Sequence, residues 1–198
     1  MIDLANIRQY TISHPEGWTA FGNKENFEAL PPTHQAQIFF LDETARAYLF
    51  SFTGPSANLI TGGSWDPFAR GNFKTVEECE ALAGTEESNA ALKKWLYGRG
   101  LSFSTSVFVL SEDHHEPLLT TWKMVVKYAP LLFFGFFGGD TMVFDSTQNW
   151  CLFYFHENRL FFGRDSQYNP AETDAEMEAL NERKKKYPQF RHPYLDGG

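Results

Sequence analysis

Four short apolar and aromatic runs follow one another between Leu131 and Gly163, and they constrain the fold more than any other feature of the chain. The runs are LLFFGFF, TMVFD, WCLFYFH and RLFFG. They are separated by Gly138-Gly139, by Ser146 to Asn149 and by Glu157-Asn158. Turn residues at such short intervals are typical of antiparallel strands joined by hairpins. We therefore expect a meandering antiparallel sheet in this part of the chain.

The run WCLFYF, Trp150 to Phe155, is apolar at both strand parities. Such a pattern indicates a central strand that is covered on both faces. Aromatic residues make up 17% of the chain, with 20 phenylalanines, and nucleic-acid bases could stack on them only beside many Lys and Arg residues. The runs lack that basic surrounding, so we expect the rings to form the core. Cys151, inside the run, is expected to be a small buried hydrophobic residue rather than a reactive thiol.

The stretch FFGFFGGD, Phe133 to Asp140, allows three interpretations. A glycine loop that holds phosphate must open a helix, but this one leads into the strand pattern TMVFD. A membrane span needs about 20 apolar residues, and the run from Leu131 to Phe137 is far shorter. We therefore predict a tight turn at Gly138-Gly139 and a bulge at Gly135.

Two helix patterns precede a strand pattern in the middle of the chain. Thr75 and Glu78 have the spacing of a capping box, which predicts a helix ending near Gly84. A second helix is predicted over Thr85 to Tyr97, and Phe103 to Leu110 then has the pattern of a strand.

Two further helices are expected later in the chain. TTWKMVVKYAP has the apolar spacing of an amphipathic helix, and Pro130 should stop it. Thr173 and Glu176 form another capping-box pattern, and the basic run Lys184 to Lys186 suits the negative end of a helix dipole. The basic run is thus interpreted as a solvated helix end rather than a nucleic-acid patch.

The segment QIFFLDETARAYLFSFTG allows two interpretations. It contains two candidate strands, Gln37 to Leu41 and Ala47 to Thr53, but its apolar residues also have the spacing of a helix capped at Thr33. The aromatic content and the stop at Gly54-Pro55 favour strands.

We expect one α+β domain over residues 1–198, in which a mainly antiparallel meandering sheet packs against several helices and a helix lies near the C-terminus. Residues 1–32 should form a peripheral N-terminal region and residues 187–198 a tail. Residues 54–71 have the composition of a long loop. In this loop Trp65 and Phe68 either pack into the core, which we favour, or mark a contact surface.

Charge and cysteine content exclude several classes of protein. The net charge of −8 argues against nucleic-acid binding, which needs a basic face, and is compatible with a basic protein partner. Two cysteines are too few for a disulfide scaffold or a thiolate zinc site. The N-terminal sequence shows no secretory signal, so we expect a cytoplasmic protein without membrane association.

Two clusters of polar residues are candidates for chemistry. His114-His115, with Glu112, Asp113 and Glu116, offers imidazole and carboxylate groups that suit a metal, but a solvated polar loop is favoured. No metal or cofactor is expected.

The second cluster centres on His156, which follows the predicted central strand. A catalytic base there would need acidic groups nearby, and Asp140, Asp145 and Asp165 lie at neighbouring predicted strand ends. Aspartates also occur at such positions simply as turn residues, so we expect no catalytic residues.

The stretches LLFFGFFGGDTMVFD and NWCLFYFHE resemble SMI1/KNR4-like domains, in which a comparable glycine turn precedes meandering strands. The resemblance covers Thr120 to Asp165. Those domains include many bacterial immunity proteins, which bind and neutralise a cognate toxin without catalysis. The resemblance therefore implies a binding role.

We accordingly expect a non-enzymatic, cytoplasmic, bacterial protein-binding module, with an immunity protein that blocks a basic toxin as the specific form. Exposed acids and aromatics would contact the partner. The candidates are Trp65, Asp66, Phe68, Glu112, Asp113, Asp140 and Asp145. One alternative is a hydrolase that uses a metal or His114, His115 or His156 with carboxylates, and another is a structural or regulatory adaptor.

Overall fold

The structure is a computed structural model that describes residues 2–15, 24–53, 68, 72–82, 84–111, 116–134, 139–167, 170–191 and 195. Its strands are β1 (Thr11–Ile12), β2 (Phe39–Leu41), β3 (Phe73–Glu80), β4 (Ser106–Ser111), β5 (Leu118–Thr121), β6 (Thr141–Phe144), β7 (Trp150–Phe155) and β8 (Arg159–Ser166). Its helices are the 3-10 helix η1 (Ile7–Tyr10) and the α-helices α1 (Lys24–Glu28), α2 (Pro32–Gln35), α3 (Glu43–Phe50), α4 (Glu86–Tyr97), α5 (Trp122–Phe133) and α6 (Pro170–Lys186).

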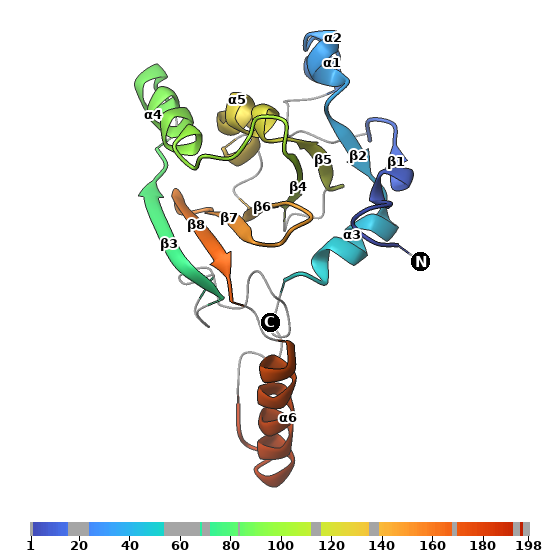
Figure 1. Cartoon of the computed structure of the whole chain (residues 1–198), viewed down its shortest axis with the longest axis vertical. Helices are drawn as coiled ribbons and strands as arrows, with labels where there is room; N and C mark the ends of the chain where they lie inside the picture. Colours follow the sequence, from blue (N-terminus) through green and yellow to red (C-terminus); the bar gives the residue numbers. More distant parts are fainter. Residues whose placement is uncertain are drawn as a thin grey trace.

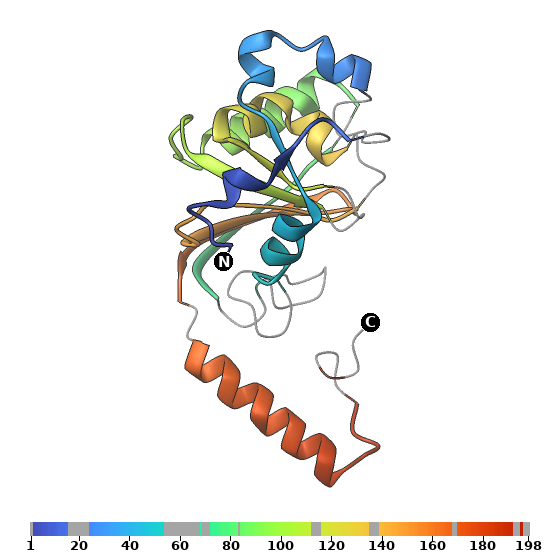
Figure 2. The same ribbon diagram turned by 90° about the vertical axis from the view of Figure 1, so that its right-hand side faces the viewer.

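The described strands form one sheet in the order β1-β2-β5-β4-β6-β7-β8-β3. Every neighbouring pair is antiparallel. Helices α4 and α5 cover one face of this sheet, while α3 and η1 lie on the other (Figures 1 and 2). The predicted α+β fold, with an antiparallel sheet, several helices and a C-terminal helix, is confirmed.

The sheet separates two hydrophobic cores, and strand β7 contributes to both. Trp150, Leu152 and Tyr154 belong to the core under α4 and α5, whereas Cys151 and Phe153 belong to the core on the side of α3. Every residue of β7 is buried. The prediction of a central strand covered on both faces is therefore confirmed, as is the burial of Cys151.

Strands β6, β7 and β8 form the predicted meander, because each pairs with the next along the chain. The two connections contain left-handed residues, with φ of 55° at Gln148 and 64° at Asn158. Asparagine adopts this conformation more readily than most residues. The turns lie where the sequence predicted them.

Leu131 to Phe133, the first residues of the run LLFFGFF, belong to helix α5, so the strand predicted there is wrong for these residues. The prediction that Pro130 stops the helix is wrong too, because α5 continues past it, and Leu132 and Phe133 are buried in the core. The non-helical backbone of Tyr128, with φ −105° and ψ 15°, introduces a kink two residues before the proline, and such a kink lets a helix accommodate proline. Gly135 and Gly138, at the predicted bulge and turn, lie outside the described residues.

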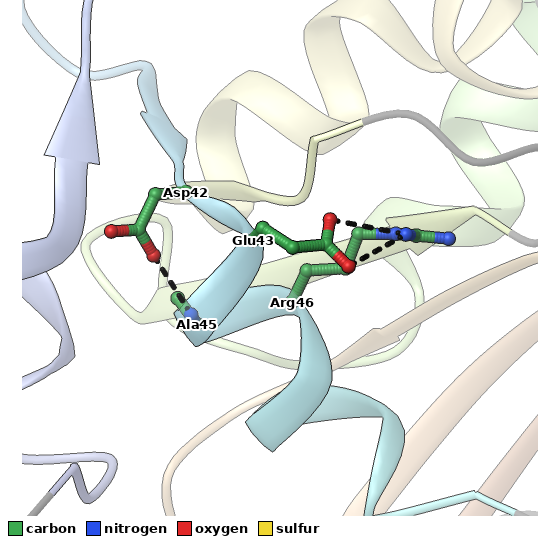
Figure 3. Close-up of polar contacts among 4 residues, drawn as sticks. All are labelled: Asp42, Glu43, Ala45 and Arg46. Carbon is green, nitrogen blue, oxygen red and sulfur yellow. Dashed lines mark hydrogen bonds and ion pairs between the residues drawn. The ribbon is translucent and has the colours of Figure 1, made fainter.

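The second strand predicted in residues 37–53 is also wrong, because Ala47 to Phe50 belong to helix α3. The Asp42 side chain accepts a hydrogen bond from the backbone nitrogen of Ala45 at 2.9 Å, and Glu43 pairs with Arg46 at 3.2 Å (Figure 3). An aspartate at this position satisfies a backbone N–H that the first helical turn leaves without a partner. The first predicted strand does contain β2, and the helix that follows is capped by Asp42 rather than Thr33 and begins at Glu43.

The helix predicted from Thr75 and Glu78 is wrong as well, because these residues belong to strand β3. This strand pairs with β8 from Phe73 opposite Ser166 to Glu80 opposite Arg159. Tertiary pairing overrides the local capping pattern here, as β-branched residues such as Thr75 favour a pleated strand.

Helix α4 matches its prediction closely. It spans Glu86–Tyr97, and Thr85 caps it in a reciprocal arrangement with Ser88. Strand β4 (Ser106–Ser111) overlaps most of the strand predicted over Phe103 to Leu110; it starts three residues later and ends one residue later.

Helix α6 begins at Pro170, three residues before the predicted cap at Thr173. Proline suits the first turn of a helix, where its missing N–H would have no partner. Figure 2 shows α6 projecting away from the sheet. Near its basic end, the Lys184 amine donates to the carbonyl oxygen of Phe190 at 2.7 Å, so the start of the expected tail folds back onto the helix.

Candidate functional site

Strands β6 and β7 bring Asp140 and His156 together at one end of the sheet. Asp140 directly precedes β6 and His156 directly follows β7, and Thr141 lies opposite Tyr154 in the antiparallel pair. The Asp140 side chain is 3% exposed, and its Oδ1 accepts hydrogen bonds from the His156 backbone nitrogen at 3.0 Å and from Nδ1 at 2.8 Å. A carboxylate bound to Nδ1 places the proton of the neutral ring there.

The His156 side chain is 48% exposed, so its ring remains accessible beside a buried carboxylate. An imidazole oriented by a carboxylate can act as a general base through its second nitrogen. Among the described residues, however, no hydroxyl or thiol is hydrogen-bonded to the ring. The pair is thus an oriented imidazole without a described nucleophile.

The Asp140 charge also affects its neighbour on β7. Burial, with a smaller contribution from Asp140, raises the pKa of Tyr154. The phenol therefore keeps its proton and donates a hydrogen bond to Oδ1 of Asn158 at 3.4 Å. These contacts tie the β7–β8 turn to the start of β6.

Asp145 and Asp165 do not converge on His156, so the catalytic arrangement weighed as an alternative from the sequence does not include them. Asp145 follows β6 and Asp165 lies near the end of β8, which places both at the opposite end of the sheet. Asp145 accepts hydrogen bonds from the backbone nitrogen and the hydroxyl of Thr147. It has the structural role of a turn residue.

The second polar cluster lies largely outside the described residues, since Glu112, Asp113, His114 and His115 are not among them. The strand before this segment ends at Ser111, which is paired with Thr141 beside Asp140. Within the described part of the chain, no group of three or more His, Cys, Asp or Glu residues could hold a metal ion.

The predicted contact residues fall into two sets. Trp65, Asp66, Glu112 and Asp113 lie outside the described residues. Phe68, Asp140 and Asp145 are buried, with exposed fractions of 5%, 3% and 8%. Phe68 packs on Phe73, in agreement with the favoured core position, so it is not an exposed contact. The expected exposure of the two aspartates is wrong, because Asp140 accepts hydrogen bonds from His156 and Asp145 accepts them from Thr147 in the turn that follows it.

Sequence reasoning missed exposed apolar and acidic side chains on the edge strand β3 and around the start of the next helix, α4; those of Val76 and Glu80 lie on the face of β3 opposite α4. We call this set of two apolar and three acidic residues the β3–α4 surface. They are Val76, Leu82, Glu80, Glu86 and Glu87. Val76 and Leu82 are 48% and 54% exposed, and none of the three acids has a hydrogen-bonded or ion-paired side chain among the described residues. The sequence pattern predicted a helix at this position, and without an edge strand there the surface could not be recognised.

Next to this surface, Arg99 joins α4 to the sheet. Its guanidinium group lies 4.1 Å from the Trp95 ring centroid and 2.6 Å from the Glu77 carboxylate. Both acids in the middle of β3 thus have a partner within the chain: Glu77 pairs with Arg99, and Glu78 pairs with Arg159 at 2.9 Å. The acidic charge that a partner could use comes from the β3–α4 surface.

Neither cysteine has the properties of a nucleophile. Burial raises the pKa of Cys79 to about 11, against a smaller opposing effect of Arg99. Burial also raises the pKa of Cys151, whose side chain has no exposed surface. A reactive cysteine needs a lowered pKa, so both thiols are structural.

Comparison with protein-family models, curated proteins and solved structures finds no match to this chain. Within the described residues, no helix combines the length and the apolar character that crossing a membrane would require.

Proposed function

We propose that this chain is a non-enzymatic bacterial protein-binding module that acts in the cytoplasm, with neutralisation of a basic toxin as its specific role. The observation that carries the proposal is the β3–α4 surface. It combines half-exposed apolar side chains with acids that have no internal partner, and it lies on an edge strand. Exposed apolar groups that are rimmed by polar residues are typical of surfaces that bind another protein.

The expected partner is basic because of the charge at this surface. The chain has a net charge of −8, to which the surface contributes Glu80, Glu86 and Glu87. Acidic patches steer a basic partner and raise its association rate. Val76 and Leu82 would supply the apolar contact. Candidate partner contacts that only the sequence supports are Trp65, Asp66, Glu112 and Asp113.

The first test measures complex formation with basic proteins encoded beside this gene. Each is co-expressed with the chain, and light scattering after size exclusion should detect a one-to-one complex. Protection of cells from one such protein would support the immunity role. Absence of any complex with these proteins would leave the adaptor role and contradict the toxin-neutralising role.

The second test locates the contact. Replacing Glu80, Glu86 and Glu87 together by Lys should weaken the complex by at least about tenfold, because like charges facing each other are costly at an interface. The control replaces Glu25, Glu178 and Glu182 by Lys, which changes the net charge equally at other exposed positions. Equal weakening by both variants would contradict the assigned surface.

A hydrolase is the second candidate function, supported by the oriented imidazole of His156. It is the weaker candidate, because the described residues supply the ring with no hydrogen-bonded nucleophile. Hydrolysis of generic ester or phosphate substrates that disappears in both His156→Ala and Asp140→Asn, while the fold is retained, would favour catalysis over binding.

A further inference from the structure

A cavity of about 370 Å³ lies on the η1 side of the sheet, over strands β2, β5 and β4. Its apolar lining includes Phe39, Phe108 and Leu119, which are neighbours across three strands. The volume falls in the range of small-molecule sites, roughly 300–1,000 Å³.

Leu119 shows that this part of the sheet lacks a complete cover among the described residues. Strand β5 is an inner strand between β2 and β4, and inner strands of a sheet with two covered faces are normally buried. Leu119 is nevertheless only partly buried, and so is its partner Phe39. The described residues leave apolar surface at the floor of the cavity.

The polar groups of the lining are arranged around that apolar floor. Arg8, Ser106 and Ser146 are exposed, and none of their side chains has a hydrogen-bond or ion-pair partner among the described residues. The Arg8 guanidinium group lies 4.4 Å from the Phe39 ring centroid, so the ring supports its plane. A guanidinium group held in this way keeps its fork of donors available for a carboxylate.

The charge of the lining selects for an anion. The chain has 25 acidic and 17 basic residues, yet among the described residues that line the cavity Arg8 is charged and none is acidic. The neighbouring acids are engaged in their own turns, since Asp3 accepts from the Asn6 backbone nitrogen and Asp145 from Thr147. Among the described residues that line the cavity, no acidic side chain therefore pairs with Arg8.

We propose that this cavity binds a small monocarboxylate with an apolar body, such as an aryl or aliphatic acid. The apolar body lies on Phe39, Phe108 and Leu119, and the carboxylate receives the donors of Arg8 with the hydroxyls of Ser106 and Ser146 at the rim. This site is separate from the β3–α4 surface, because β5 and β3 lie far apart in the strand order.

The test is a titration of the isotopically labelled full chain, followed by amide chemical shifts. Phenylacetate and hexanoate should give saturable shifts at low-millimolar concentration, centred on β2, β4 and β5. Phenylacetamide, which has the same shape without the charge, should bind at least about tenfold more weakly, because a charged hydrogen bond contributes about that factor. Acetate keeps the charge but lacks the apolar body, and it should also bind at least about tenfold more weakly because it buries little apolar surface.

Two variants and a matched control complete the test. Arg8→Gln should weaken phenylacetate binding about tenfold, and Ser106→Trp, which places a ring at the cavity, should remove it. Arg159→Gln is the control, since its guanidinium group also lies over a ring, that of Phe161 at 5.6 Å, but on β8 near the opposite edge of the sheet. Equal binding of phenylacetamide, shifts centred elsewhere, or no saturable shift with either acid would overturn the proposal.

Discussion

At the scale of single residues, close packing against the sheet determines which side chains this chain tolerates. Gly163 is paired with Cys151 on one side and Val76 on the other. A Cβ atom at this position would lie 2.5 Å from Cδ2 of Phe73. The glycine is therefore required by the ring that covers it.

Replacing Gly163 by Ala should lower the free energy of unfolding by about 1–3 kcal/mol, the usual cost of overpacking a core. Urea unfolding measures this change. The double variant with Phe73→Leu should lose less than the sum of the two single changes, since the clash is shared. Additive losses would contradict the assigned contact.

The Cys79 thiol should react slowly with iodoacetamide, because its pKa is raised to about 11 from an ordinary value of 9.0. At pH 8 the rate should be about 100-fold below that of the unfolded chain, since only the thiolate reacts. The rate should keep rising through pH 10. The raised pKa stabilises the fold below pH 9, and this contribution is lost as the pH rises through about 11. A plateau near pH 9 would contradict the burial of the thiol.

At the scale of secondary-structure elements, strong local patterns were predicted correctly and weak ones were decided by tertiary contacts. Strands β6, β7 and β8 were predictable because turn residues separate apolar runs, and α4 because its cap precedes a clear apolar spacing. The pattern failed at Thr75, where pairing with β8 outweighs the capping signal. It failed again at Leu132, where an apolar run alone does not distinguish a strand from a buried helix end.

The candidate site was predictable only in part, for a related reason. Asp140 and His156 were recognised as neighbours because they terminate adjacent predicted strands. Their burial and hydrogen bonds depend on the sheet register, which a sequence pattern does not supply. The β3–α4 surface required β3 to be recognised as an edge strand.

Helix α3 offers a direct test at this scale. Asp42→Ala should lower the free energy of unfolding by about 1 kcal/mol, because the N–H of Ala45 loses its acceptor. Asp42→Asn keeps an oxygen at the cap and should restore most of the loss. Chemical denaturation compares the two. Equal stability of the alanine and asparagine variants would show that the cap contributes nothing.

At the scale of the whole molecule, a sheet between two cores supports a helix that projects from it. Core packing is distributed over the sheet, α3, α4 and α5, whereas α6 is polar and extends away (Figure 2). Exposed charge on α6 favours solvent contact rather than core formation. The stability of the sheet is thus expected to depend little on α6.

A chain that ends after Gln167 should therefore keep the fold of the sheet. Its urea midpoint should match that of the full chain, while far-UV circular dichroism loses the helical signal of α6. A large drop in the midpoint would show that α6 or the residues after it stabilise the sheet.

The central claim is that this protein acts by binding through the β3–α4 surface. Hydrogen exchange with and without its partner, read by mass spectrometry, tests it most directly. We predict new protection over residues 73–80 and 84–90, and unchanged exchange at residues 139–145 and 155–158. Protection confined to the Asp140–His156 end of the sheet, with residues 73–90 unchanged, would contradict it.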